Sequence, residues 1–591
     1  MVKCMNKLFF GEMVDELLVF AFFFVPFVNF SPVACGVVLL CSLFSLVGGV
    51  SGIMRNRPNV AFILVFAFMV YASLSSLLLH AETSSMTPLQ FQIRLPLLLF
   101  ALAFLIRGRI PLRRAMKSFA YGSYGMVLIV LLVFAYSLVA DFDNVPRSFM
   151  NVRFCFQSVV ALVVHRTYMC FDLLTALLIF YHLFSDSWNK RKVSVFLTIY
   201  VLTGLFVYLT DARISFLSFL FLSFCLFFLE LRRLVPGWKG WVIMLFALIV
   251  LFFLLLRNER VNNILISLND STFSLSEADP RFKIWSCGWE LIKHCPHPLW
   301  GYGCGTAAGL LQEVYEERDF ALAIESRWEM HNQFLEVLVE NGVVGLLLFV
   351  GMLLFPMFGK TSLRSYYRIW IPMLCVNLFF ESMLSRSIGT YPVAAILLMA
   401  GLSDEKEDFA PSRGWKWFCL VSSLIAVLCL SVKCIQKDKK SAYASFQRFF
   451  ERVDTLPGDL PQDLVGAYGL QIDNRTKTEQ WHEWATMYYC FDQGSVSESD
   501  SVSFSIYMYA SKDFDAEMLQ IRLEERQCRA YVASYDLSRR GEWQKLTINQ
   551  KGLYGNAVYT VSCAKKNVNS FSGMHGFAIF AQPIIKITQN K

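Results

Sequence analysis

The histidine at position 331 opens the part of the chain whose residue types could do chemistry. His331 and Asn332 end a polar segment, and the run from Gln333 onward is apolar enough to enter a bilayer apart from two carboxylates. A neutral imidazole can accept a proton near pH 7, and a helix that starts beside it would fix its position. The sequence therefore suggests His331 as a catalytic base; the alternative is a histidine at the membrane interface without a chemical role.

Two arginines extend this hypothesis to a class of substrate. Arg281 lies in the same polar segment as His331, and Arg213 lies at the start of an apolar run, beside Asp211. Ionisable residues at membrane depth are costly and are usually functional or paired, so the simpler interpretation is that Asp211 and Arg213 bracket a turn at the interface. A guanidinium group stays charged and binds phosphate oxygens in pairs. Two arginines beside a histidine would therefore suit a diphosphate.

The polar segment 257–332 is the one long connection expected on the outward side of the membrane. Long connections between spans often carry binding and catalytic residues. Closely spaced glycines would let the backbone approach a ligand, although a glycine-rich turn without a helix signature is weak evidence for a phosphate site and alone predicts a turn. The other distinctive residues of the segment are Asp279, Pro280, Trp285, His297, Pro298, Gly301, Tyr302, Gly303, Cys304 and Gly305.

Several carboxylates lie inside apolar runs and need partners there. Glu336 and Glu340 are four residues apart on one stripe of the expected helix, and His331 points elsewhere by helical spacing. We therefore expect the two carboxylates to pair with polar groups inside the bundle rather than to act as the base. Glu381 lies in another apolar run, and Arg386 is a candidate partner.

Two further histidines are alternatives to the main candidate. His165 and Tyr168, one helical turn apart in an expected span, could line a lipid cavity, but packing is the more frequent role for such residues. His297 could compete with His331 as the base, but its proline neighbour indicates a structural turn.

The composition is that of a polytopic membrane protein. The 591 residues are 55% hydrophobic and 17% charged, with 55 Phe, which is too apolar for a soluble protein. The net charge of +8 does not indicate nucleic-acid binding, because the basic residues cluster in short loops between apolar runs. The 16 cysteines show no CxxC spacing, and no metal or redox motif is predicted.

We predict a polytopic α-helical membrane protein. A bilayer core is about 30 Å thick and needs roughly 20 apolar residues per helix, and about 12 to 13 transmembrane helices satisfy that length. The candidates are 14–30, 34–52, 59–79, 94–106, 117–139, 157–184, 193–210, 213–230, 240–256, 333–356, 367–385, 388–402 and 415–434.

The basic loops predict the orientation. They fall between alternate pairs of spans, so they lie on one side, which we expect to be the cytoplasm together with the N-terminus. Lys3 and Lys7 precede an apolar run without a small-residue cleavage site, so a retained first span is expected. The connection 257–332 and the tail then face the periplasm. The basic loops are Arg55 and Arg57, Arg107 to Arg114, Lys190 to Lys192, Arg232 to Lys239, Lys360 to Arg368, and Arg413 to Lys416.

The expected domains follow from these changes in composition. They are the N-terminal helices 1–256, the periplasmic loop 257–332, the C-terminal helices 333–434, and a β-rich extracytoplasmic domain 440–591.

In the tail, segments such as 502–508 and 557–561 alternate polar with apolar residues or contain runs of β-branched and aromatic residues. This pattern predicts a β-sandwich. Its aromatics could bind glycans, although strand aromatics usually form the core. Cys490, Cys528 and Cys563 could form one disulfide in an oxidising compartment.

The motifs in the second half of the chain resemble the signature of the O-antigen ligase and polymerase superfamily. The resemblance runs in order over roughly residues 190–400, whereas the N-terminal spans agree in topology only and the tail lies outside it. The upstream arginine motif corresponds to Ala212-Arg213, where the superfamily more often has Ser before the arginine. The other motifs are Asp279-Pro280-Arg281 with Trp285, His297-Pro298-Leu299 with Gly301-Tyr302-Gly303, His331 to Leu335 with Glu340, Gly342, Gly345 and Leu346, and Glu381 to Leu384.

The resemblance implies an inverting O-antigen ligase-type glycosyltransferase with a GT-C-like fold in the bacterial inner membrane. It implies a donor glycan on undecaprenyl diphosphate, an acceptor hydroxyl on a lipid A-core sugar, and no cofactor or metal. By this analogy His331 activates the acceptor, while Arg213 and Arg281 neutralise the leaving diphosphate. The supporting residues would be Asn332, Trp285, Gly303, Glu340 and Glu381.

Other functions share these features. An O-antigen polymerase or a protein O-oligosaccharyltransferase of the same superfamily would use the same donor with another acceptor. A transporter is suggested by the number of spans alone, but the polar residues gather at one outer face rather than at a midplane site. The pair Asp141 and Asp143 resembles a metal site of other membrane glycosyltransferases, and its recurrence as Asp513 and Asp515 indicates chance.

Overall fold

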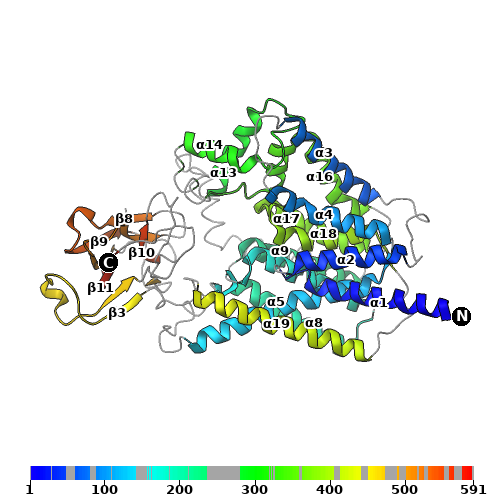
Figure 1. Cartoon of the computed structure of the whole chain (residues 1–591), viewed down its shortest axis with the longest axis horizontal. Helices are drawn as coiled ribbons and strands as arrows, with labels where there is room; N and C mark the ends of the chain where they lie inside the picture. The colour runs from blue at the N-terminus through cyan, green and yellow to red at the C-terminus, as the bar shows by residue number, and fades with distance from the viewer. Residues whose placement is uncertain are drawn as a thin grey trace. The chain divides into compact units, whose positions relative to one another are not determined.

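The fold is described by a computed structural model (Figure 1). The residues that it describes are 2–27, 30–47, 60–79, 88–107, 109–140, 156–157, 159–161, 163–185, 187–210, 212–235, 280–318, 320, 323, 327–358, 363–404, 413–440, 450–472, 489–490, 501–515, 518–524, 530–551, 558–564 and 576–588. The chain divides into two compact units, residues 1–131 with 163–431, and residues 132–162 with 432–591.

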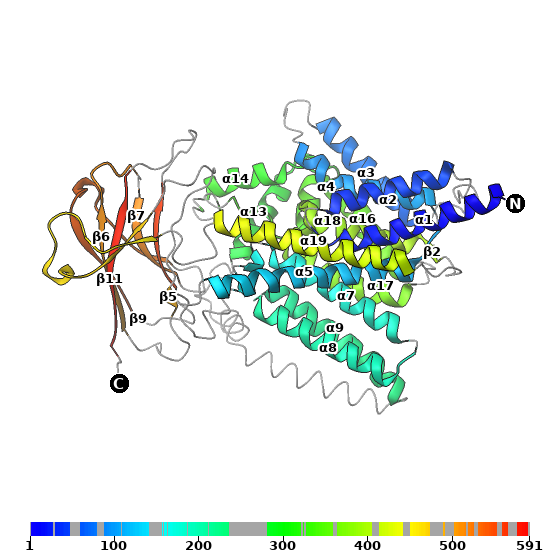
Figure 2. The ribbon, with the colours of Figure 1, turned by 60° about the horizontal axis from the view of Figure 1, so that its bottom comes forward.

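The first unit is a bundle of helices whose sequences are mostly apolar (Figure 2). Two short parallel strands, β1 (Arg109–Ile110) and β2 (Ser403–Asp404), also belong to it. Its helices are α1 (Val2–Phe24), α2 (Ser31–Val47), α3 (Val60–Leu79), α4 (Pro88–Arg107), the first part of α5 (Leu112–Ala140), α7 (Arg166–Ser185), α8 (Lys190–Leu209), α9 (Arg213–Leu234), α13 (Pro280–Lys293), α14 (Ala307–Glu317), α16 (Gln333–Phe358), α17 (Arg364–Phe380), η1 (Met383–Ser385), α18 (Ser387–Leu398), η2 (Met399–Gly401) and the first part of α19 (Arg413–Lys440).

The helices support a multi-pass membrane protein. Among the described residues, six helices (α5, α7, α8, α9, α16 and α19) are long and apolar enough to cross a bilayer, and shorter apolar helices lie in α2, α3, α4 and α18. Each predicted span except 240–256, which lies outside the described residues, overlaps a helix. The span expected at 367–385 extends past the end of α17 at Phe380. The span expected at 157–184 differs at its start, because α7 begins only at Arg166 and His165 precedes it.

Side-chain contacts show that α7 and α17 are antiparallel. The Trp370 indole nitrogen donates a hydrogen bond to the Thr175 hydroxyl at 3.0 Å, and one turn earlier the Tyr366 ring contacts the His182 ring at 6.1 Å. Because α16 and α17 pack together across a short connection, α16 runs in the same direction as α7. The starts of α7 and α16 and the end of α17 therefore lie at one end of the bundle.

The helix α9 also starts at this end. The Asn377 amide donates to the Ser218 hydroxyl at 2.8 Å, which joins the last turn of α17 to the second turn of α9. Lys190, Arg233 and Arg364, at the opposite ends of α8, α9 and α17, therefore lie at the other end of the bundle.

The helix α16 is broken at Gly342, and the segment 298–303 fills the break. Gly342 has φ 63° and ψ −167°, which only glycine adopts readily. A broken helix leaves amide and carbonyl groups unpaired, and the inserted segment satisfies them. The backbone bonds are Tyr302 N to Val339 O at 2.9 Å, Gly303 N to Glu340 O at 2.8 Å, and Val343 N to Pro298 O at 3.0 Å.

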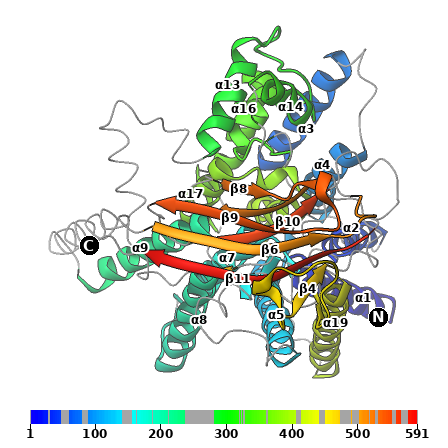
Figure 3. The same cartoon turned by 90° about the vertical axis from the view of Figure 1, so that its left-hand side faces the viewer.

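The C-terminal unit contains two antiparallel sheets (Figure 3). Their antiparallel strands confirm a β-rich tail, and the face-to-face packing of a sandwich stays a prediction. One sheet has the order β3 (Phe450–Val453), β4 (Gly469–Ile472), β11 (Ala578–Thr588), β6 (Ser501–Ala510) and β9 (Trp543–Lys551); the other has β5 (Tyr489–Cys490), β10 (Val558–Ala564), β7 (Met518–Glu524) and β8 (Ala530–Ser534).

Aromatic side chains of the first sheet form its core rather than a surface. Tyr507, Tyr509 and Trp543 are each less than a tenth exposed and belong to one apolar cluster. Burial of these rings is the ordinary role of strand aromatics. Of the three tail cysteines, Cys528 lies outside the described residues.

The substitution Gly342→Ala should destabilise the helix bundle. A Cβ there would lie 2.4 Å from the Leu299 carbonyl carbon, and the residue would keep a positive φ. We expect a loss of about 3 kcal/mol in the free energy of unfolding, measured by denaturant titration in detergent micelles. The control is Gly351→Ala on the same helix, where the nearest atom is 3.9 Å away; equal stability of the two variants would contradict the role of Gly342.

Candidate active site

His331 stands immediately before α16 on a constrained backbone. Its φ is 48°, in the left-handed region that non-glycine residues rarely adopt. The next residue, Asn332, is buried and caps the helix, because its side-chain oxygen accepts a hydrogen bond from Leu335 N at 3.0 Å. The cap and the left-handed turn together fix the direction of the imidazole. Such strain is often found at functional sites.

The imidazole of His331 faces the carboxylate of Glu381. His331 Nδ1 lies 3.4 Å from Glu381 Oε1, and the two side chains are 25% and 7% exposed. Glu381 follows the last helical residue of α17 in extended backbone. The sequence suggested Arg386 as the partner of Glu381. Arg386 instead contacts Glu329 Oε1 at 3.1 Å, so proximity in sequence did not identify the residue that contacts Glu381.

Gln333 connects the two segments that carry His331 and Glu381. Its side-chain oxygen accepts a hydrogen bond from Leu384 N at 2.6 Å, and its side-chain nitrogen contacts the Ser385 hydroxyl at 3.4 Å. The turn after α17 is therefore held directly against the start of α16. This arrangement keeps the imidazole and the carboxylate together.

The electrostatic environment favours a charged Glu381. Burial alone would raise the pKa of its carboxyl, but the contact with His331 and the charges of His165 and Arg281 together lower this pKa below its ordinary value. The carboxylate therefore contacts the imidazole of His331 and also interacts electrostatically with His165 and Arg281. Arg281 and His331 are fifty positions apart in the chain, yet both act on the same carboxylate.

Arg281 reaches this position because α13 packs against the end of α17. Trp285, one turn after Arg281, contacts the rings of Phe379 at 5.2 Å and Phe380 at 6.0 Å. About one turn later on α13, a Cβ at Gly288 would lie 2.5 Å from the Met330 sulfur, so the helix also lies against the residue before His331. Trp285 thus anchors the helix that presents Arg281.

Arg213 begins α9 at the same end of the bundle. Its side chain is exposed, and the Ser215 hydroxyl, two residues later, contacts Thr167 O at 3.4 Å. This contact places the start of α9 beside the start of α7, close in sequence to His165. Asp211 and Asp279, which the sequence interpretation placed beside the two arginines, lie outside the described residues.

His165 is part of this site and is not inside a span. It precedes α7, is exposed, and packs its ring against Tyr168 at 4.9 Å. Desolvation lowers the pKa of His165; the negative charge of Glu381 opposes this shift, and the positive charges of Arg386, Arg166 and His331 add to it. The sequence favoured a packing role, which the contact with Tyr168 supports, but it carried no sign of the interaction with the distant carboxylate.

Gly303 and Glu340 belong to the support of α16. The Glu340 carboxylate accepts a hydrogen bond from Gly305 N at 2.7 Å. A Cβ at Gly301 would lie 2.5 Å from the Glu340 backbone. The glycine-rich turn therefore lets the backbone approach α16 rather than a ligand.

Glu336 and Ser385 also face this region. The Ser385 hydroxyl donates to Glu336 Oε1 at 2.5 Å, so Glu336 pairs with a polar group of the bundle. The sequence contained no signal for Ser385 or Glu329, since both lie in short connections whose position depends on long-range packing.

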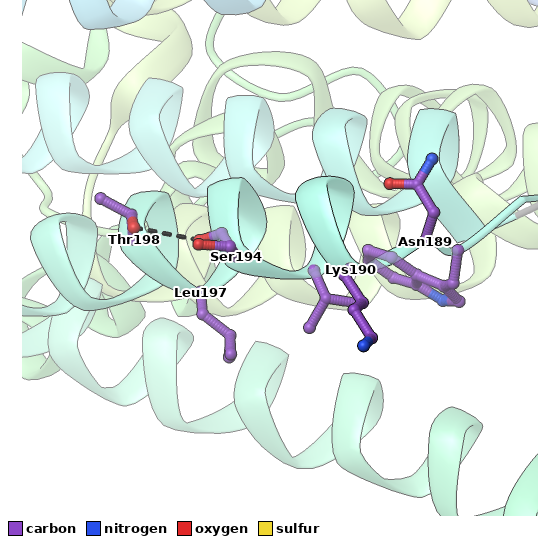
Figure 4. Close-up of a pocket in the computed structure, with 7 residues that line it drawn as sticks. Asn189, Lys190, Ser194, Leu197 and Thr198 are labelled. Carbon is purple, nitrogen blue, oxygen red and sulfur yellow. Dashed lines mark hydrogen bonds between the residues drawn. The ribbon is translucent and has the colours of Figure 1, made fainter.

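Among the described residues, neither a group of metal-binding side chains nor a surface hollow was found at the site around His331 and Glu381. Within the described ranges, no group of three or more His, Cys, Asp or Glu is placed to hold a metal ion; Asp141 and Asp143 fall outside those ranges. Figure 4 shows a hollow on α8, lined by Trp188, Asn189, Lys190, Val193, Ser194, Leu197 and Thr198. It begins at the end of α8 opposite the turn before Arg213.

Comparison with known proteins identifies the superfamily of the central segment. Residues 198–350 match the sequence profile of the family described as O-Antigen ligase. They therefore belong to the O-antigen ligase superfamily, which implies a glycosyltransferase-like membrane enzyme that acts on a lipid-linked glycan and an acceptor. The match contains Arg213, Arg281 and His331, and Glu381 follows it. The search of curated proteins found no match.

Glu381→Gln should reduce the acid sensitivity of the fold. The pKa of Glu381 is lowered in the folded protein, so its stabilising contribution is present above its ordinary value of 4.5 and is lost as the pH falls through the folded-state pKa. Thermal unfolding in detergent, followed from about pH 6 to about pH 3, should show a smaller loss for Glu381→Gln than for the wild type. Glu290→Gln, which breaks an exposed pair with Arg318, should behave as the wild type. An equal loss in all three proteins would show that the buried carboxylate is not the titrating group.

Proposed function

We propose that this chain is an inverting glycosyltransferase that moves a glycan from undecaprenyl diphosphate to a sugar hydroxyl, as an O-antigen ligase does. The observation that supports this function is the contact between His331 and Glu381 at 3.4 Å, with Arg281 acting on the same carboxylate. An orienting carboxylate, a histidine and a fixed cation are the groups that such a transfer needs.

His331 is the proposed base. Its Nδ1 faces Glu381, so a proton on Nδ1 would leave the Nε2 lone pair for the acceptor hydroxyl. The acceptor O–H bond breaks and its proton goes to Nε2, while the acceptor oxygen forms a bond to the anomeric carbon. The bond from that carbon to the diphosphate breaks on the opposite face, and its electron pair leaves with the diphosphate. Glu381 stabilises the imidazolium that forms.

Arg281 and Arg213 are the proposed ligands of the leaving diphosphate. Negative charge grows on the diphosphate as the glycosidic bond breaks, and a fixed guanidinium stabilises that charge without reorganisation. Arg281 lies on α13 next to the dyad, and Arg213 stands exposed at the start of α9 at the same end of the bundle. We propose that these cations act in place of a metal ion.

The proposed orientation places this site at the periplasmic face of a bacterial inner membrane. Lys190, Arg233 and Arg364 lie at the other end of the bundle, as expected of residues on the cytoplasmic side. The site then faces the leaflet that would present a translocated lipid-linked glycan. A lipid A-core sugar is the proposed acceptor on that face.

Replacement of His331 by Ala should abolish transfer with little effect on folding. We expect a loss of about a thousandfold, because the base is removed while the cap at Asn332 remains. The assay is transfer from a labelled lipid-linked glycan in membranes, normalised to protein that has inserted. His294→Ala, an exposed histidine of the same segment, is the control and should retain wild-type activity. Full activity of His331→Ala would rule out this base.

The gel pattern of lipopolysaccharide from a deletion strain distinguishes the ligase from the polymerase. Loss of a ligase leaves bare core and strands the glycan on its lipid carrier. Loss of a polymerase instead leaves core that carries a single repeat unit. We expect bare core, and restoration of the full ladder by the wild-type chain but not by His331→Ala.

Two substitutions of Arg281 should distinguish the effect of its positive charge from the effect of its paired hydrogen-bond donors. We expect Arg281→Ala to reduce transfer by about a hundredfold, and Arg281→Lys to recover only part of it, because an ammonium lacks the paired donors of guanidinium. Initial rates over a series of donor concentrations measure this effect. Arg318→Ala, which removes an exposed ion pair with Glu290, should change the rate little. Similar rates for all three variants would remove Arg281 from donor binding.

A further inference from the structure

The surface hollow on α8 lies at the end of the bundle opposite His331 and has no part in the proposed transfer. It has a volume of about 720 Å³, and all of its lining residues lie between Trp188 and Thr198 (Figure 4). Of the 20 residues of α8, three are buried, namely Thr203, Phe206 and Val207. The helix therefore lies at the edge of the bundle, and in a membrane the hollow would open to lipid.

The polar end of the hollow is formed by side chains with fixed positions. The Trp188 indole nitrogen contacts Glu230 Oε1 at 3.4 Å, and the Trp188 ring packs against the Phe196 ring at 5.6 Å. The Asn189 side chain caps α8, because it accepts a hydrogen bond from Lys192 N at 2.8 Å. A tryptophan ring is typical of the headgroup level of a bilayer, so this end of the hollow would lie at the membrane surface.

Basic side chains gather around this end of α8. The helices α8 and α9 are joined by a short turn and lie side by side, since the Tyr200 hydroxyl donates to the Ser223 hydroxyl at 2.7 Å. Lys190 lies ten residues before Tyr200, and Arg233 lies ten residues after Ser223. The start of α8 and the end of α9 are therefore at the same level of the bundle. The basic residues there are Lys190, Arg191, Lys192, Arg232 and Arg233.

The charge around the hollow is predominantly positive. The carboxylate of Glu230 is already paired with Arg233 at 3.0 Å, and Asp186 lies outside the described residues. Three basic side chains are exposed and form no ion pair with a described residue, namely Lys190, Arg191 and Arg232. One further carboxylate would not balance them, so this end of the bundle attracts anions.

An apolar stripe continues from the hollow along the helix. Leu197 lies two turns after Lys190, and both side chains extend to the same side of α8 (Figure 4). Val201 and Leu205 follow at the spacing of one helical turn and are 62% and 51% exposed. Ser194, whose side chain is exposed, lies between the charged and the apolar part. A charge, a hydroxyl and an apolar stripe thus follow one another in the order of the headgroup, the ester linkages and the acyl chain of a phospholipid.

We propose that this hollow binds an anionic phospholipid in the leaflet opposite the candidate active site. The phosphate would lie between Lys190 and Ser194, and an acyl chain would follow Leu197 and Val201. A soluble anion would leave the apolar stripe uncovered, and a zwitterionic headgroup would gain less from the excess of positive charge. The inference does not depend on the proposed transfer, because it concerns the other end of the bundle.

The test is lipid binding by the purified, delipidated full-length chain in detergent. Thermal unfolding is measured with phosphatidylglycerol, with phosphatidylcholine of the same acyl chains, and with glycerol phosphate as the headgroup alone. Phosphatidylglycerol should raise the midpoint of unfolding at about a tenth of the concentration that phosphatidylcholine needs, and glycerol phosphate should leave the midpoint unchanged. Equal effects of the two phospholipids, or an equal shift with glycerol phosphate, would overturn the proposal.

One pair of variants tests the charge. Lys190→Gln should weaken phosphatidylglycerol binding about fivefold, because it removes one cation beside the headgroup. Lys117→Gln is the matched control, since Lys117 is an exposed lysine near the start of α5 and does not line the hollow. It should bind as the wild type. Equal weakening in both variants would indicate a general attraction to the surface and would overturn the site.

A second pair tests the hollow itself. Ser194→Phe should fill the hollow and weaken binding about tenfold without a change in charge, because the acyl chain loses its apolar contact. Val195→Phe is the control, since Val195 is exposed on the same helix and does not line the hollow. All the positions changed in the two pairs are exposed, so the variants should fold. Full binding by Ser194→Phe would overturn the proposal.

A comparison with His331→Ala separates this inference from the proposed function. That variant should lose transfer and keep the midpoint shift with phosphatidylglycerol. Lipid binding by a wild-type chain that transfers no glycan would contradict the enzyme and keep the lipid site. Transfer by a chain that does not prefer phosphatidylglycerol would overturn the lipid site and keep the enzyme.

Discussion

The buried carboxylate of Glu381 imposes the main physical constraint on this site. A carboxylate removed from water must find compensating charge or hydrogen bonds, and few groups in an apolar bundle can supply them. Here His331, His165 and Arg281 do so from three separate parts of the chain. The packing of α7, α13, α16 and α17 at one end of the bundle is what brings these groups together. The position of the candidate base therefore depends on the helices far more than on the segment in which the histidine lies.

The broken helix α16 makes this arrangement rigid. In a continuous helix the backbone groups near Gly342 would bond to each other. The break leaves these groups available, and they form hydrogen bonds with the turn at 298–303. Tyr71 of α3 adds to the same turn, because its hydroxyl donates to Leu299 O at 2.6 Å. The polar segment before His331 is thus fastened to the bundle at its middle and at its end. Rigid support of this kind would hold a base at a fixed distance and orientation relative to its substrate.

The local patterns of the sequence predicted more than its long-range contacts. The change from a polar segment to an apolar run located the start of α16, and the Asn332 cap explains why that start is sharp. Apolar run lengths located the apolar helices of the described part of the chain, because membrane thickness sets that length. They did not predict α13 and α14, which lie within the polar segment expected to be a loop. The partner of Glu381 could not be found in this way, since the contact with His331 depends on how α16 and α17 pack. For the same reason the glycine-rich stretch could be predicted as a turn, but its contact with α16 could not.

The arrangement of charge around the dyad connects donor binding to proton transfer under the proposed function. His331 must change from a neutral to a cationic ring during the reaction, and Glu381 favours the cation while the nearby Arg281 opposes it. A diphosphate bound to Arg281 would offset that positive charge. The imidazolium would then form more easily when the donor is present than when the site is empty. Proton removal from the acceptor would be favoured only after the leaving group is in place. A single pair of opposite charges, Arg281 at the start of α13 and Glu381 after the end of α17, would then order the two steps.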